Sequence, residues 1–499
     1  MTEPDGASGA EDLPQQMKVR REKLDRLTAA GLEGYPVGFP RTTTLGALRE
    51  RFADLAPETR TGERVAVAGR VMARRGQGKL AFAVLRDSTG EIQVMLSEDR
   101  LGAERLAAWQ HDVDLGDHVG IEGEVMTSRR GELSVLASTF VITAKALRPL
   151  PDKHKGLNDP EARVRQRYVD LIVNPEARRM VEVRAAVLRS LRDTLDRRGF
   201  LEVETPVLHH LHGGAAARPF VTHLNAFDTE MSLRIALELH LKRLIVGGLD
   251  RVYEIGRIFR NEGVDSTHSP EFTMLEAYEA YGDYDTMAEL TRDLVLDAAR
   301  AIGRTVVPDG AGGDIDLEAP WRTVTVHEAV SAAVGTEVTL ATPLEELRRL
   351  AEKHDVSLQP AWGAGEVVLE LFEKLVEDTL REPTFVRDYP TEVRPLARAH
   401  RSTAGLVEAW DLIINGVELA PAYSELVDPV EQRRRLTEQS IRAAGGDPEA
   451  MEIDEDFLRA LEYGMPPTGG MGLGVDRLVM LPTGTGIRET ILFPLLRPE

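Results

Sequence analysis

The chain has 499 residues, of which 42% are hydrophobic, and its 82 acidic against 61 basic residues give a net charge of −21 at pH 7. This length predicts two or more domains, and no apolar run approaches the ~20 residues that cross a bilayer, so we expect no membrane partner. Cysteine is absent, which excludes disulfides, thiolate zinc sites and a cysteine nucleophile, and the acidic start is the reverse of a signal peptide. We therefore expect a cytoplasmic protein.

The first part of the chain predicts little regular structure. Residues 1–17 are rich in Gly, Ala and acidic residues and predict a disordered tail. Residues 18–60 predict an N-terminal helical segment, whose basic first helix, Lys18–Ala30, ends at Gly31.

Period-two alternation dominates the next part. Five short β runs, with a helix over Leu101–His111 after the third, predict a β-barrel of the OB type over residues 61–150. A polar stretch, residues 151–170, predicts a linker. The open face of such a barrel suits unstacked bases, although alternation alone leaves open whether Phe82 lies on that face or in the core.

Residues 171–499 predict one large domain. It starts with an amphipathic helix over Val181–Arg198 and a strand over Phe200–Leu208 that contains Pro206, a residue typical of sheet edges and interfaces. The stretch 282–400 shows helices without a chemical motif and is interpreted as scaffold.

Two strand-like runs, joined by a charged loop, begin at Arg251 and His268. Arg260 ends the first run and Glu262 follows in the loop. An arginine held at a strand end can bind a phosphate bidentately, and a nearby carboxylate can accept from an amino group such as that of adenine. The second run places four side chains on one face, namely Phe272, Met274, Glu276 and Tyr278. Taken alone, the loop is better interpreted as a salt-bridged surface loop.

A glycine pattern far along the chain strengthens this interpretation. Gly470, Gly472 and Gly474 alternate along one strand, and Arg477 starts the helical run after it. Such glycines let a backbone approach a flat ligand, and the arginine can reach its phosphates. In this order the two elements resemble motifs 2 and 3 of class II aminoacyl-tRNA synthetases.

Further blocks resemble the class II lysyl-tRNA synthetases, in particular the bacterial, actinobacterial type, from about residue 18 to the C-terminus. These blocks are 213–220, 239–248, 423–426 and 461–467. The resemblance implies an α+β multidomain fold: an N-terminal OB-fold β-barrel that binds the anticodon, and an antiparallel β-sheet catalytic domain flanked by helices. It also implies a homodimer formed through Phe200–Leu208.

The implied activity is ATP-dependent activation of L-lysine to lysyl-adenylate, followed by transfer to the 3′ end of tRNA(Lys). Catalysis would rest on positioning and charge stabilisation. The matching catalytic residues are Arg260 and Arg477. ATP would also meet Glu262, His268, Phe272, Glu418 and Gly474. Lysine would meet Gly214, Glu238, Arg260, Glu276, Tyr278 and Glu425. The anticodon would meet Phe82, Gln93 and Glu132.

A hairpin signal, Asn415-Gly416, places two carboxylates together. Pairing of Ile413 with Glu418 puts Asp411 diagonal to Glu418 on the same face, about 7 Å away. Two such carboxylates can hold a hard cation with phosphate oxygens, although a half-polar hairpin face is the simpler interpretation. The resemblance favours Mg²⁺ at Asp411 and Glu418.

Basic residues gather at Lys18–Arg26 and Lys145–Arg167, where they predict either solvated faces or contacts to the tRNA backbone. Several positions depart from the usual bacterial pattern, namely Pro421, Ala422, Thr267, Leu237 and Asp411. These departures keep two alternatives open. One is a paralogue that supplies lysyl-tRNA to a side pathway such as lysyl-phosphatidylglycerol synthesis, and the other is a non-catalytic, RNA-binding pseudo-synthetase.

Overall fold

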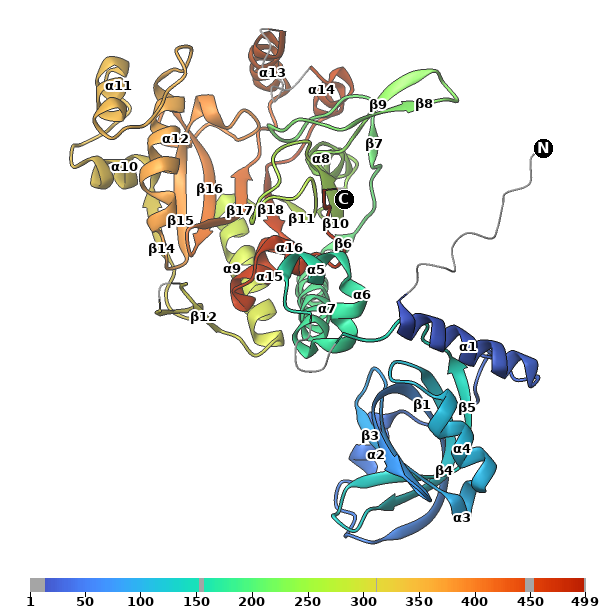
Figure 1. Cartoon of the computed structure of the whole chain (residues 1–499). Coiled ribbons are helices and arrows are strands. Elements are labelled where there is room, and N and C mark those ends of the chain that lie inside the picture. The colour runs from blue at the N-terminus through green and yellow to red at the C-terminus, as the bar shows by residue number, and fades with distance from the viewer. Residues whose placement is uncertain (1–13, 152–156, 311, 445–452, 498–499) are drawn as a thin grey trace. The chain divides into compact units, whose positions relative to one another are not determined.

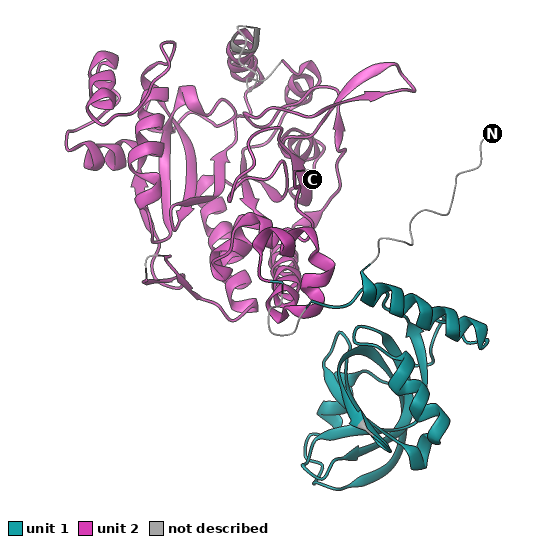
Figure 2. Cartoon of the chain, in the orientation of Figure 1, with its two compact units in different colours: residues 1–157 teal, residues 158–499 magenta. Residues whose placement is uncertain are grey.

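The computed structural model describes residues 14–151, 157–310, 312–444 and 453–497. The chain divides into two compact units, residues 1–157 and residues 158–499 (Figure 2). Most of the expected disordered tail, residues 1–17, lies outside the described residues. The first helix, α1 (Gln15–Ala29), already begins within its last residues.

The first unit is built around a closed barrel with the strand order β1-β2-β3-β5-β4 (Figure 1). The strands are β1 (Arg60–Gln77), β2 (Leu80–Arg86), β3 (Glu91–Ser97), β4 (His118–Thr127) and β5 (Leu133–Ala144). The helices are α1, α2 (Leu45–Arg51), α3 (Glu98–Leu101) and α4 (Ala103–Asp112). The expected barrel is confirmed. The single helix expected over Leu101–His111 is instead two, because Gly102 between α3 and α4 has a φ of 80°.

Alternation along β2 decides the position of Phe82. Ala81, Ala83 and Leu85 are buried in the barrel core, whereas Phe82 and Val84 are half-buried on the outer face. Phe82 therefore does not belong to the core, and its ring is presented on the outside of the barrel.

A buried ion cluster lies where β5 ends and β4 begins. The side chain of Lys145 is fully buried, and its Nζ lies 2.6 Å from Asp114 Oδ2 and 2.7 Å from Asp117 Oδ2. Asp117 also accepts a hydrogen bond from the backbone N–H of Ala146 at 2.7 Å. The cluster ties the end of β5 to the segment between α4 and β4.

The expected linker, residues 151–170, is partly helical. Its second half forms α5 (Pro160–Arg165) and the start of α6 (Arg167–Val173). The buried Asp170 accepts from Arg167 Nη1 at 2.7 Å and from Arg163 Nε at 3.0 Å. The sequence suggested that Lys145 and Arg167 belong to a basic surface. Both side chains are instead buried and paired with aspartates, so neither contributes to such a surface.

The second unit is organised by an eight-stranded sheet (Figure 1) with the order β14-β15-β16-β17-β18-β11-β10-β6. In this order the strands are β14 (Arg322–Thr325), β15 (Thr384–Pro390), β16 (Leu406–Ile414), β17 (Val417–Ser424), β18 (Thr468–Gly474), β11 (Glu271–Ala280), β10 (Arg251–Phe259) and β6 (Leu201–Glu202). All neighbours are antiparallel except the β14–β15 and β10–β6 pairs. An antiparallel sheet with flanking helices confirms the expected fold class.

Helices cover the sheet from several sides. The long helix α9 (Tyr284–Ala301) packs across β16, β17 and β18, and α7 (Pro175–Arg197) packs on α9. The remaining helices are α8 (Glu238–Val246), α10 (Val326–Val334), α11 (Leu344–Lys353), α12 (Ala364–Leu375), α13 (Pro429–Ala444), α14 (Glu455–Glu462), α15 (Val475–Thr483) and α16 (Ile487–Thr490), with the 3₁₀ turns η1 (Glu377–Thr379) and η2 (Thr391–Val393). Among the described residues, no helix is both long and apolar enough to pass through a bilayer.

The strand expected over Phe200–Leu208 is interrupted. It appears as β6 and β7 (Leu208–His209), with Pro206 between them. β7 joins β9 (Thr229–Leu233) and β8 (Val221–Leu224) in a separate three-stranded sheet, and β12 (Val306–Pro308) pairs with β13 (Asp314–Asp316). Proline cannot donate to a ladder, which is a physical reason for the break.

We predict that Lys145→Met destabilises the barrel by about 3–5 kcal/mol, because it leaves Asp117 buried without its cation. Hydrogen exchange of the β4 and β5 amides in the full chain measures this loss locally. Lys79→Met is the matched control: Lys79 Nζ lies 3.0 Å from Glu98, but its side chain is 80% exposed. That control should cost at most ~1 kcal/mol. Equal protection in both variants would contradict the prediction.

Candidate functional site

A cavity of about 360 Å³ opens on the second unit, on the sheet face formed by β11, β18 and β17. Its lining contains all but one of the residues to which the sequence assigned a catalytic, ligand-binding or metal-binding role in this unit, namely Gly214, Glu238, Arg260, Glu262, His268, Phe272, Glu276, Tyr278, Glu418, Glu425, Gly474 and Arg477. Asp411 is the exception. Side chains from segments more than 250 residues apart in the numbering therefore meet in one place.

Glycines form the floor of this cavity. Gly470, Gly472 and Gly474 of β18 pair with Tyr278, Glu276 and Met274 of β11. A Cβ atom on Gly472 would lie 2.7 Å from Met274 Cε, and one on Gly470 would overlap the Glu425 carboxylate. Any side chain on this face of β18 would fill the cavity, so the alternating glycines create the space into which the neighbouring side chains point.

The side chains of β11 alternate between the hydrophobic core and the cavity. Leu275 and Ala277 pack in the core that includes α9, whereas Met274, Glu276 and Tyr278 face the cavity. Glu276 Oε1 accepts from the backbone N–H of Leu237 at 2.9 Å, and its Oε2 accepts from the Tyr278 hydroxyl at 3.2 Å. Both oxygens are thereby held, and the carboxylate is fixed at the cavity wall.

Leu237 is one of the departures from the usual pattern, where proline is common. Because proline carries no N–H, only a residue such as leucine can make the 2.9 Å hydrogen bond to Glu276. The departure adds a donor that stabilises the ionised form of this carboxylate.

Carboxylates cluster at one end of the cavity, on α8, β11 and the chain after β17. Glu238, Glu276 and Glu425 are 5%, 3% and 2% exposed. Burial raises the pKa of Glu276 to about 7, and burial raises the pKa of Glu425 to about 8, although the nearby Lys242 opposes the second shift. A cation entering this end would find buried acceptors, and it would favour their ionised forms.

Arginines mark the other end. The Arg260 guanidinium lies 5.3 Å from the centroid of the Phe272 ring, and its Nε donates to Ile235 O at 3.3 Å. Burial lowers the pKa of Arg260, but a guanidinium stays charged in proteins. Arg477 at the start of α15 donates from Nη1 to Glu418 O at 2.6 Å. Two guanidinium groups beside an aromatic face suit a nucleotide with its phosphates.

The loop between β10 and β11 is exposed and carries Glu262 and His268. His268 Nδ1 lies 2.9 Å from Asp265 Oδ2, and Thr267 Oγ1 donates to Asp265 Oδ1 at 3.0 Å. Thr267, where a basic residue is usual, thus helps to hold the carboxylate that orients the imidazole.

The carboxylate pair on the hairpin differs in detail from the expected register. Ile414 pairs with Val417 and Ile413 with Glu418, as expected, but the register then shifts and Asp411 pairs with Pro421. Asp411 is buried, and its Oδ2 lies 2.5 Å from Arg394 Nη2. Asp411 Oδ1 has no hydrogen-bond partner among the described residues. The bulge thus changes which β17 residue lies opposite Asp411.

Three functional candidates come from the stretch that was interpreted as scaffold. Arg394 lines the cavity and pairs with Asp411. Burial raises the pKa of Glu377 to about 7, with Glu418, Glu373 and Asp411 raising it further. Glu373 and Glu377 therefore lie close enough to the carboxylate pair to interact with it. No motif marks these residues in the sequence, because only the folding of α12 and η1 towards β17 brings them there.

Within residues 14–151, 157–310, 312–444 and 453–497, no group of three or more His, Cys, Asp or Glu side chains is arranged to hold a metal ion. An ion at the hairpin would need oxygens beyond those of Asp411 and Glu418. The phosphates of a nucleotide could supply them.

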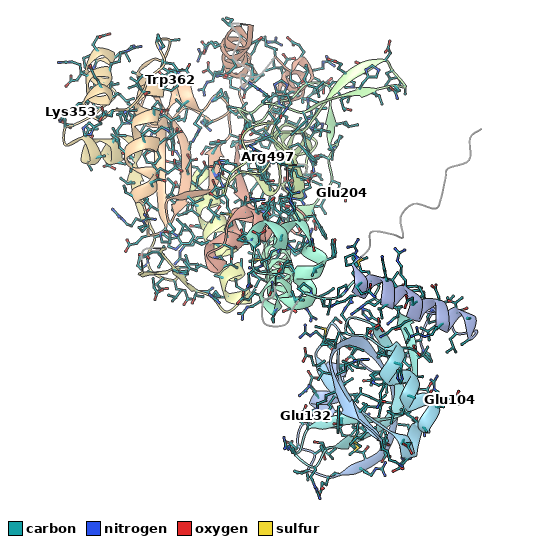
Figure 3. All side chains as sticks on the ribbon, in the orientation of Figure 1. Glu104, Glu132, Glu204, Lys353, Trp362 and Arg497 are labelled. Carbon is teal, nitrogen blue, oxygen red and sulfur yellow. The ribbon has the colours of Figure 1, made fainter. Side chains whose placement is uncertain are left out.

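The barrel has a concave face of its own, which holds a pocket of about 900 Å³. Phe82, Gln93 and Glu132 all line it, so the structure brings together the three residues singled out there. The Arg75 guanidinium lies 5.2 Å from the Phe82 ring centroid. Gln93 Nε2 donates to Ser134 Oγ at 2.9 Å, and Glu132, labelled in Figure 3, is half-exposed. An aromatic ring with amide, carboxylate and guanidinium groups suits an unstacked base.

Family models match both units. Residues 159–497 match the tRNA synthetases of class II (D, K and N), and residues 65–143 match the OB-fold nucleic acid binding domain.

The relatives agree with these models over the full chain. The lysine–tRNA ligase of Kineococcus radiotolerans is 57% identical over 98% of this chain and 98% of its own length. The lysine–tRNA ligase of Mycolicibacterium gilvum is 55% identical over 100% of this chain and 99% of its own. The lysylphosphatidylglycerol biosynthesis bifunctional protein LysX of Nocardia farcinica is 54% identical over 99% of this chain, but this match covers 44% of that longer protein. With one family model matching most of its length and relatives this similar throughout, the chain belongs to the class II tRNA synthetases.

Proposed function

We propose that this protein activates L-lysine with ATP to lysyl-adenylate and transfers the lysyl group to the 3′ end of tRNA(Lys). The observation that carries the proposal is the charge pattern of the cavity, with buried carboxylates at one end and arginines at the other. A diamino acid fits the first end and a nucleoside triphosphate fits the second. Relatives named lysine–tRNA ligase, 53–57% identical over nearly the whole chain, support the same conclusion.

The buried carboxylates also favour one amino-acid substrate over the others that this family uses. The matching model covers synthetases designated D, K and N. The carboxylate of aspartate would meet Glu425 as a like charge, and the amide of asparagine would bring no opposite charge, whereas the ammonium of lysine would bring one. A buried ammonium without such a partner would be costly. Glu425 with Tyr278 therefore supports lysine as the substrate.

We assign the α-amino group of lysine to Gly214, Glu238 and Glu276, and the ε-ammonium to Glu425 and Tyr278. Arg260 would hold the lysine carboxylate beside the α-phosphate of ATP. The carboxylate oxygen then attacks the α-phosphorus, and pyrophosphate leaves. The enzyme's contribution to this step is alignment and charge stabilisation, with no covalent enzyme intermediate.

The nucleotide would lie over the glycine floor. Phe272 would stack on the adenine, Glu262 would accept from its amino group, and Gly474 would permit close approach. Arg477 and His268 would meet the outer phosphates. In the second step a terminal ribose hydroxyl of tRNA attacks the lysyl carbonyl, and AMP leaves.

The donor set at the hairpin fits Mg²⁺. Asp411 and Glu418 offer hard carboxylate oxygens, and the buried Asp411 Oδ1 lacks a protein hydrogen-bond partner among the described residues. When bound, Mg²⁺ would neutralise negative charge on the phosphates. Arg394 holds the other oxygen of Asp411 in place.

The barrel face would bind the anticodon. Phe82 would stack on a base, and Gln93 and Glu132 would offer hydrogen bonds to base edges. The outer position of Phe82 and the shared concave face support this assignment.

Two alternatives differ from this proposal in distinct ways. A non-catalytic RNA-binding role would not require Arg260, Arg477 and Glu425 in one cavity, and their convergence supports catalysis. A role in lysyl-phosphatidylglycerol synthesis would use the same lysyl-tRNA chemistry. Whether the lysyl-tRNA serves lipid modification or protein synthesis depends on the enzymes that use it, and not on this cavity.

A homodimer is part of the proposal. Exposed apolar side chains follow the edge at β6, β7 and β8, namely Leu201, Val207, Leu208, Leu211, Val221 and Phe227, which are 39–76% exposed. Exposed apolar residues on sheet edges support an interface there.

Glu425→Gln should abolish most lysine-dependent ATP–pyrophosphate exchange. Loss of the buried anion costs about 3–5 kcal/mol, or roughly 10²–10⁴-fold in kcat/KM for lysine, while the KM for ATP stays unchanged. Glu438→Gln on α13, whose side chain is 57% exposed, is the matched control. Exchange by the natural chain with no standard amino acid would favour the RNA-binding role instead.

Lysine binding should tighten as the pH rises from 6 to 8 and should release protons near pH 7. The raised pKa values of Glu276, about 7, and Glu425, about 8, mean that the empty cavity is partly protonated, and the ammonium groups bind the ionised forms. Calorimetry in buffers of different ionisation enthalpy counts these protons. A count that is the same in Glu425→Gln would be inconsistent with this assignment.

Leu208→Asp should convert the protein from a dimer to a monomer, because it buries an unpaired charge in the interface. Light scattering after size-exclusion chromatography at micromolar concentration reports the mass. Val430→Asp, at a 78% exposed position on α13, is the control and should leave the mass unchanged. A natural chain that runs as a monomer would refute the proposed dimer.

A further inference from the structure

Lys242 is a fully buried lysine directly behind the cavity. It lies on α8, one helical turn after Glu238, and its side chain is 0% exposed. Its Nζ lies 2.6 Å from Glu238 Oε1 and 2.5 Å from Glu425 Oε2. Lysine is almost never fully buried unless it is paired, so this position needs an explanation beyond packing.

Lys242 does not line the cavity, whereas both of its partners do. Its neighbours on α8, Leu241 and Ile245, are apolar core residues, but an apolar side chain at 242 would leave Glu238 and Glu425 buried without a cation. Removing one partner of a buried ion pair is strongly destabilising, because it leaves an uncompensated buried charge. The lysine is therefore explained by the two carboxylates that it holds, and both of these line the cavity.

The ammonium uses one oxygen of each carboxylate and leaves the other. Glu425 Oε2 lies against Lys242, while Oε1 lies over Gly470 and has no hydrogen-bond partner among the residues that the structure describes. Glu238 likewise gives its Oε1 to Lys242. One cation thus orients two carboxylates that belong to opposite ends of the amino-acid site.

The same cation sets the charge of the site. Glu238, Glu276 and Glu425 contribute three carboxylates and Lys242 one ammonium, which leaves an excess of two negative charges when all are ionised. A diamino acid brings two ammonium groups. The balance would be lost with a neutral side chain at 242, because Glu425 would then have three acidic or phenolic neighbours and no cation.

We infer that Lys242 is a positioning residue of the amino-acid site: it links Glu238 to Glu425 from behind and matches the charge of the cavity to a ligand with two ammonium groups. This inference rests on the proposed lysine activation. It deepens that proposal, because it assigns the choice of a diamino acid to a residue that does not touch the substrate.

Lys242→Met tests it by lysine-dependent ATP–pyrophosphate exchange between pH 6.5 and 9. We expect the KM for lysine at pH 7 to rise about 10–100-fold, the range for a misplaced binding group, with the KM for ATP unchanged. The groups facing Glu425 are Lys242 and Glu238 on α8 and Glu276 and Tyr278 on β11. Without Lys242 the pKa of Glu425 rises further, so the defect should shrink towards pH 9.

Two outcomes would overturn the inference. One is a natural KM for lysine in Lys242→Met, and the other is a defect that is equal for lysine and ATP and independent of pH, as lost packing would produce. Lys374→Met, on the 61% exposed Lys374 of α12, controls for the loss of a lysine charge. Failure of the natural chain to exchange with lysine would refute the proposed function itself, which separates the two failures.

Lys242→Arg keeps the test open if the methionine variant does not fold. The positive charge remains, so the pH profile should match that of the natural chain. The larger guanidinium should push Glu425 into the cavity and thereby shorten the cavity. The preference for lysine over ornithine, which is one methylene shorter, should then fall by about 10-fold. An unchanged preference would overturn the inference.

Discussion

Close packing over the glycine face of one strand, β18, is the constraint on which this site depends. Gly470, Gly472 and Gly474 leave one face of β18 without side chains, and side chains of β11 and β17 extend over this face. A side chain at Gly470 would displace the Glu425 carboxylate, and one at Gly472 would strike Met274. The volume of the cavity, the direction of its carboxylates and the approach of a flat ligand all follow from this bare surface.

Electrostatics divides the cavity along its length. Buried carboxylates at one end are expensive in free energy unless cations accompany them, and the fold provides Lys242 and leaves the remaining charge for a ligand. At the other end, the positive charges of Arg260 and Arg477 favour a negatively charged ligand. A molecule that brings ammonium groups together with a nucleotide that brings phosphates would satisfy both ends at once, which is the chemistry of amino-acid activation.

The positions that depart from the usual pattern have local structural roles. Leu237 supplies an N–H to Glu276, Thr267 holds Asp265 beside His268, and Asp411 pairs with Arg394. Pro421 lies where pairing between β17 and β18 stops, and it lines the cavity. Ala422 is buried in the core and does not line the cavity, so its methyl group does not narrow the site.

The sequence by itself predicted the barrel from its strand alternation, and its resemblance to the class II synthetases implied the fold of the second unit and most residues in the cavity. Strand alternation and glycine spacing are local properties, and each predicts which side chains share a face before any packing is known. Only the tertiary structure decided what depends on contacts between distant segments. The bulge that sets Asp411 opposite Pro421, the approach of Glu373, Glu377 and Arg394, the burial of Lys145 and the outer position of Phe82 are of this kind. Lys242 belongs with them. A glutamate four residues before a lysine is an ordinary surface pair on a helix. Only Glu425, from the chain after β17, makes this pair part of a buried site, because burial and charge depend on what the rest of the chain places around a residue.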